Sequence, residues 1–138
     1  MKRVRLTRLA WVGPLSVATA VLAVLAIQAI AIRAISPLPR FSHAILSSTE
    51  PAILTAILGS AAVAVFALCV RWAVDPLRKY RQLAIAALLV SFLPNIAAGL
   101  LMRPAVDWPS MMVLMVMHVA AWAVTVSMLT RLTTVDGR

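Results

Sequence analysis

The chain has 138 residues, of which 63% are hydrophobic and 12% charged, and its mean hydropathy is +0.99. This apolar share is far above that of a soluble domain and indicates a membrane protein. The net charge of +9 comes from short basic clusters between long apolar runs, so it predicts contact with anionic lipid headgroups at the cytoplasmic face and not with nucleic acid. With Cys69 as the single cysteine, an intrachain disulfide, paired-thiol redox chemistry and a cysteine zinc site are excluded.

Four apolar runs predict four transmembrane helices, because each is close to the roughly 20 residues that cross a bilayer. They cover residues 9–32, 51–74, 82–102 and 109–130. The predicted fold is an all-α membrane protein, an antiparallel four-helix bundle that forms one domain over residues 1–138. The first run follows the basic start "MKRVRLTR" but is much longer than the apolar core of a signal peptide, so we favour an uncleaved anchor over a cleaved leader.

Basic residues in the connections predict the orientation. Ten of the 13 Lys and Arg residues fall in the N-terminal segment, the second connection and the C-terminal tail, and three fall in the first and third connections. The positive-inside rule then places both termini in the cytoplasm, as in a multi-pass protein of the bacterial inner membrane. Aromatic anchors agree with this topology: Trp11, Trp72 and Tyr80 are expected at the inner interface and Trp108 at the outer one.

The first connection, residues 33–50, is the longest and contains two prolines. Its "FSHAIL" segment has the pattern of a short amphipathic piece lying on the membrane surface, and we expect this connection to be the docking surface. Gln28 is the only strongly polar residue of the first helix and is expected at the helix end or in contact with this connection.

The third run, "QLAIAALLVSFLPNIAAGLLM", combines small and polar residues with a proline. Every fourth position gives a stripe that we expect to meet another helix: Ala87, Ser91, Asn95 and Gly99. Pro94 cannot donate a backbone hydrogen bond, so a kink is expected there, with Ser91 or a water serving a carbonyl near position 90. Small residues recur in the second run as well, beside Gly59, and favour close helix packing.

The fourth run contains a central histidine, His118. Asn95 and His118 are 11 and 12 residues from the connection near position 106, so an antiparallel pair of helices places them at nearly the same depth. The interpretation we favour is a hydrogen-bonded latch between the two helices. The alternative is a polar cavity at Ser91, Asn95 and His118 that binds a small ligand or relays protons.

A third reading of the same helix is a copper site. Met111, Met115 and His118 share one helical face, and thioethers suit Cu(I), but methionine is also a common filler of apolar packing. No metal or other cofactor is therefore predicted. A bis-histidine haem site lacks its second central histidine, since His43 lies in the first connection.

Catalytic groups are missing from the predicted membrane interior. The four carboxylates all lie at or beyond predicted helix ends: Glu50, Asp75, Asp107 and Asp136. Carboxylate-coupled proton antiport has no obvious group to use, and no motif of the common soluble enzyme classes is present. The sequence favours a non-enzymatic structural or accessory subunit that packs as a homo-oligomer or within a larger membrane complex.

The C-terminal half, with "LLVSFLP" and "MHVAAWAVTVSMLTRL", resembles a family of small bacterial four-helix membrane proteins defined as a domain of unknown function. The resemblance covers about the last 50 residues and extends to the first half only in hydropathy. Members of that family tend to carry a Met-His pair in the last helix and a Leu-Thr-Arg ending. The resemblance implies the four-helix topology and directs attention to Met117, His118 and Arg131, but it implies no reaction.

Overall fold

The computed structural model describes residues 2–4, 6–34, 47–101 and 108–136. Four helices account for most of them: α1 (Leu6–Ala34), α3 (Glu50–Trp72), α4 (Pro76–Leu101) and α5 (Trp108–Leu132). Each is long and apolar enough to cross a membrane, which confirms the prediction of four membrane-length helices. Two three-residue strands, β1 (Lys2–Val4) and β2 (Thr134–Asp136), lie at the chain ends.

α4 begins six residues before the predicted start of the third run. Asp75 precedes it as the capping residue: its Oδ1 accepts a hydrogen bond from the backbone N–H of Arg78 at 3.3 Å, and its carbonyl accepts one from the N–H of Lys79 at 3.1 Å. Pro76 occupies the first helical position, where its missing N–H costs nothing. Hydropathy places the start too late because charged residues join the hydrogen-bond ladder as readily as apolar ones.

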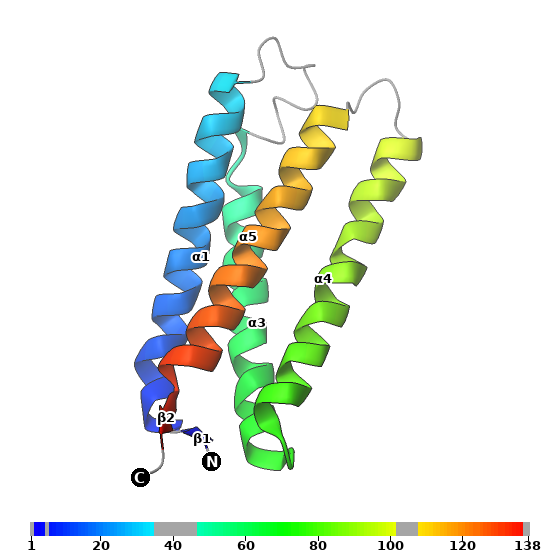
Figure 1. Cartoon of the computed structure of the whole chain (residues 1–138). Helices are drawn as coiled ribbons and strands as arrows, with labels where there is room; N and C mark the ends of the chain where they lie inside the picture. Colours follow the sequence, from blue (N-terminus) through cyan, green and yellow to red (C-terminus); the bar gives the residue numbers. More distant parts are fainter. Residues whose placement is uncertain (1, 5, 35–46, 102–107, 137–138) are drawn as a thin grey trace.

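The helices form a ring in which each contacts its neighbours in the chain, closed by extensive packing of α1 against α5 (Figure 1). One apolar cluster joins all four helices where the chain ends and the α3–α4 corner meet, which we call the basal end (lower in Figure 1). Its buried members are Leu9, Val12, Phe66, Cys69, Tyr80, Val126 and Leu129. Nearer the opposite end, a smaller cluster centred on Val24 and Met117 packs α1 on α5.

The buried face of α1 repeats every three or four residues, as expected of a helix packed along one side. It consists of Leu9, Val12, Ser16, Ala20, Val24, Gln28 and Ala31. Gln28 donates from Nε2 to the carbonyl oxygen of Ser48 at 2.9 Å, which confirms the predicted contact with the first connection. The "FSHAIL" segment at 41–46 lies outside the described residues.

α1 and α3 approach closely at two buried glycines. A Cβ built on Gly13 would lie 2.9 Å from Cγ1 of Val63, and one built on Gly59 would lie 3.3 Å from Cγ2 of Val17. Each glycine thus accepts a valine of the opposite helix. The close packing expected beside Gly59 is present, and it is centred on these two pairs.

The chain ends are tied together, which the sequence did not predict. β1 and β2 pair antiparallel, with Arg3 opposite Val135. Arg8 Nη1 also donates to the carbonyl oxygen of Leu132 at 3.5 Å. Three residues are too few for a strand pattern to be visible in the sequence.

One predicted interfacial aromatic is instead part of the core. Tyr80 is 2% exposed and meets the ring of Phe66 edge-on, with centroids 4.9 Å apart. The prediction placed it at the interface because it follows a basic stretch, but its helical phase turns it into the bundle. Trp11, Trp72 and Trp108 are exposed, as interfacial anchors would be.

Candidate functional site

The face that α4 turns toward the other helices carries the predicted polar residues. From Tyr80 onward, the residues of α4 that are buried or half-buried along this face are Tyr80, Ala84, Leu88, Ser91, Phe92, Asn95 and Ala98. Ser91 and Asn95 therefore lie on the packed side, but Ala87 is exposed, so the predicted stripe does not follow the packed face. The surroundings of Gly99 lie outside the described part of the chain.

His118 lies across from this face on α5 and is half-buried. Its Nδ1 is 2.6 Å from the carbonyl oxygen of Leu114, one turn earlier in the same helix. A carbonyl can only accept, so Nδ1 carries the proton and, in the neutral ring, Nε2 keeps a free lone pair. The ring of Phe92 stands edge-on to the imidazole at a centroid distance of 6.3 Å. We call Ser91, Phe92, Asn95, His118 and Trp122 the α4–α5 seam.

Asn95 does not form the predicted latch. Among the described residues its buried Nδ2 has no hydrogen-bond partner, and no hydrogen bond joins it to His118. The Leu114 carbonyl engages only Nδ1, and Nε2 could still accept from Asn95, so the latch is absent because the packing of α4 against α5 does not bring Asn95 Nδ2 to Nε2. Equal depth in the two helices predicted that Asn95 and His118 lie near each other, but it could not predict which acceptor the imidazole N–H would bind.

Ser91 differs from the expectation in its partner, whereas the predicted kink at Pro94 stays a prediction. Ser91 Oγ donates to the carbonyl oxygen of Leu88 at 2.7 Å, so it does not serve a carbonyl at position 90. α4 continues as one helix through Pro94, which lies on its exposed side together with Val90. Pro94 has no N–H to offer the Val90 carbonyl, its usual partner one turn earlier.

Two further polar groups in the bundle were missed by the sequence reasoning. The indole Nε1 of Trp122 and the hydroxyl of Tyr80 are buried without a hydrogen-bond partner in the described part of the protein. Trp122 follows His118 by one helical turn and packs against the basal cluster that contains Tyr80. The four-residue spacing of His118 and Trp122 was the available signal.

The seam can therefore offer donors at Asn95 Nδ2 and Trp122 Nε1 and an acceptor at His118 Nε2. Each of these groups can bind a water or a carbonyl or hydroxyl group of a small molecule. A hydroxyl or thiol nucleophile paired with a base is not found among its hydrogen bonds.

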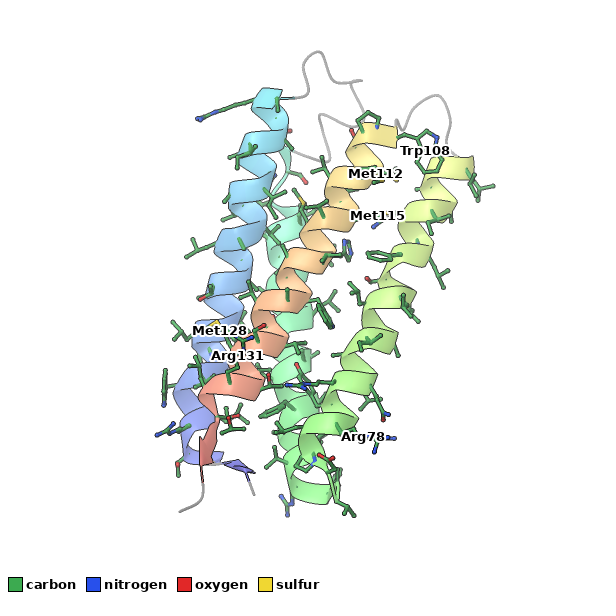
Figure 2. The ribbon with its side chains drawn as sticks, in the orientation of Figure 1. Arg78, Trp108, Met112, Met115, Met128 and Arg131 are labelled. Atoms are coloured by element: carbon green, nitrogen blue, oxygen red, sulfur yellow. The ribbon has the colours of Figure 1, made fainter. Side chains whose placement is uncertain are left out.

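The methionines of the copper hypothesis differ in burial. Met111 is 3% exposed, whereas Met115 and His118 are half-buried and Met112 is exposed (Figure 2). Since Nδ1 of His118 is engaged, only Nε2 would be free for a metal. Within the described residues, no group of three or more His, Cys, Asp or Glu side chains could hold a metal ion.

No family model, curated protein or solved structure matches this chain. The resemblance of the C-terminal half to a bacterial four-helix family therefore stays a prediction. The case for a function rests on the geometry of the helices and their polar groups.

Proposed function

We propose that the protein is a multi-pass protein of the bacterial inner membrane, with antiparallel helices and both termini in the cytoplasm. In this proposal it acts as a non-enzymatic accessory subunit, and its first partner is a second copy of itself, bound through the exposed face of α4. The topology is that of the bacterial four-helix family which the C-terminal half resembles.

The proposed orientation is supported by the charge at the basal end. Six cationic residues lie in or beside the basal ends of the four helices: Arg8, Arg71, Arg78, Lys79, Arg81 and Arg131. Arg33, in the last turn of α1, lies at the opposite end. Basic residues concentrate on the cytoplasmic side of inner-membrane proteins, so the basal end is the cytoplasmic one in this proposal.

The exposure of α4 carries the proposal of self-association. In its most apolar stretch 6% of the residues are buried, against 17% to 28% in the other three helices. Ala86, Val90 and Pro94 follow one another at four-residue intervals along its exposed face. On this face Ala86 provides a small side chain, and the Val90 carbonyl lacks its usual backbone hydrogen bond because Pro94 has no N–H.

Hydrocarbon offers no donor to such a carbonyl, whereas a neighbouring helix can cover or satisfy it. A small residue one turn away lets that helix come close. A second copy that packs the same face of α4 against this one would cover the Val90 carbonyl of both copies, because a two-fold interface uses the same patch on each partner.

Native mass spectrometry of the full chain from mild detergent tests the proposal. We expect a dimer for the wild type and a monomer for Ala86→Trp, because the indole would hold the two α4 helices apart. Ala18→Trp places the same bulk on the exposed face of α1 and should leave the dimer intact. A monomeric wild type, or equal loss of dimer in the two variants, would contradict self-association through α4.

A second candidate function is supported by the α4–α5 seam: binding of water or a small polar ligand between the helices. The specific observation is that Asn95 Nδ2 is buried without a partner, which costs free energy unless something fills the place. Solid-state NMR with polarisation transfer from water, in bilayers, tests it at the imidazole of His118. We expect transfer to Nε2; a dry imidazole that no added small polar solute perturbs would exclude this function.

A further inference from the structure

An open groove lies at the basal corner, where α3 ends and α4 begins. Its volume is about 620 Å³, within the range of small-molecule sites. The walls are mainly apolar and include Val65, Leu68 and Trp72 of α3, Val74 of the connection and Leu83 of α4. The groove opens to the outside of the bundle, toward the lipid if the helices span a membrane.

The rim of the groove is cationic. Arg78 and Lys79, in the first turn of α4, line it and are exposed; Figure 2 shows Arg78 at the basal end of that helix. Neither side chain forms an ion pair with a carboxylate of the described residues. Asp75 also lines the groove, but its Oδ1 already accepts the N–H of Arg78 as a helix cap. Arg71 and Arg81 flank the corner, so positive charge exceeds negative charge there.

We infer that this groove is a binding site for an anionic glycerophospholipid, with the phosphodiester at Arg78 and Lys79 and an acyl chain along Leu68 and Leu83. The dimensions agree. From Val65 to Trp72 the α3 wall advances by seven residue steps, about 10 Å at ~1.5 Å per residue, which accommodates the part of an acyl chain next to the glycerol. Trp72, which lines this wall, has an exposed indole, a side chain that favours the headgroup region of membranes.

Charge decides the choice of occupant. An apolar groove alone would accept any acyl chain, and an uncharged helix would leave Arg78 and Lys79 without a counter-charge. A phosphodiester attached to an acyl chain supplies both complements in one molecule, and basic pockets at the cytoplasmic ends of helices are suited to such headgroups. The site does not depend on self-association, because the face containing Ala86, Val90 and Pro94 does not line the groove.

The experiment measures retention of phosphatidylglycerol on the full-length protein by native mass spectrometry, with zwitterionic phosphatidylcholine as the comparison lipid. We expect the wild type to retain phosphatidylglycerol preferentially. The double variant Arg78→Gln, Lys79→Gln should weaken its binding by about 30-fold, roughly fivefold for each charge removed. Inorganic phosphate in millimolar excess should not displace the lipid, because it cannot fill the apolar walls.

Arg131→Gln is the matched control: it removes an exposed charge at the basal end, outside the groove. If it weakens phosphatidylglycerol binding as much per charge as the groove variant does, attraction is diffuse and the site is overturned. Equal retention of the two lipids by the wild type, or displacement by phosphate alone, would overturn it as well. Loss of a protein dimer without any change in lipid retention would assign the groove to a protein partner instead. Circular dichroism confirms that each variant remains helical.

Discussion

Replacing Gly13 by alanine tests the closest contact between α1 and α3. The added Cβ would stand 2.9 Å from Cγ1 of Val63, whereas carbon atoms at optimal separation are about 3.5 to 4.0 Å apart. The contact is therefore too short by about 0.6 to 1.1 Å, and both atoms are attached to helices that are packed along their length. Val63 is a β-branched residue in a helix, where one rotamer is strongly preferred, so it cannot simply turn aside.

Overpacking of this kind typically costs 1–3 kcal/mol. The usual gain in helix propensity over glycine is offset here, because residue 13 precedes Pro14 inside α1 and its Cβ would crowd the proline ring, so we expect Gly13→Ala to lower the free energy of unfolding by about 1–3 kcal/mol. Gly59→Ala is the matched comparison, because its Cβ would lie 3.3 Å from Val17 Cγ2 and needs a shift of only a few tenths of an ångström. Its effect should be close to zero.

Equilibrium unfolding in mixed micelles, or steric trapping in bilayers, measures these differences. A double-mutant cycle with Val63→Ala isolates the contact, because that variant removes the clashing Cγ1. In the Val63→Ala background the cost of Gly13→Ala should fall by at least about 1 kcal/mol. If Gly13→Ala is as stable as the wild type, or if its cost is the same in both backgrounds, the close approach of α1 and α3 at this point is refuted.

Three further outcomes follow from the buried polar groups and the thiol. Tyr80→Phe should leave the free energy of unfolding unchanged or raise it by up to about 1 kcal/mol, since the buried hydroxyl has no partner; a clear decrease would reveal a hydrogen bond to it. Asn95→Leu should likewise not lower the free energy of unfolding of the isolated protein in micelles. A decrease of about 1 kcal/mol that disappears in the His118→Phe background would show that Asn95 and His118 do form the interhelical latch. Cys69 is 7% exposed and should resist maleimide in the native protein but react after denaturation in SDS, whereas rapid labelling of the native protein would show that the reagent reaches the thiol, either through the groove that Cys69 lines or by opening of the basal cluster.

The membrane-length helices could be predicted from the sequence because the signal is chemical and local. A run of some 20 apolar residues is long enough to cross a membrane as a helix, and the four runs correspond to α1, α3, α4 and α5. The contact of Gln28 with the first connection was also predictable, since a lone amide near a helix end can reach the adjacent backbone. These conclusions need no knowledge of how the helices are rotated against one another.

Rotation and distance were decided only by the tertiary structure. The helices are apolar on nearly every side, so periodicity in the sequence does not distinguish the packed face from the lipid-facing one. Tyr80 therefore lies in the core and Ala87 outside, and His118 Nδ1 binds the Leu114 carbonyl in its own helix while Asn95 Nδ2 stays without a partner among the described residues. The pairing of β1 with β2 joins residues from opposite ends of the chain, and the groove at Arg78 forms only where α3 meets α4. Each depends on which surfaces meet in three dimensions, a property of the packed bundle that no single helix contains.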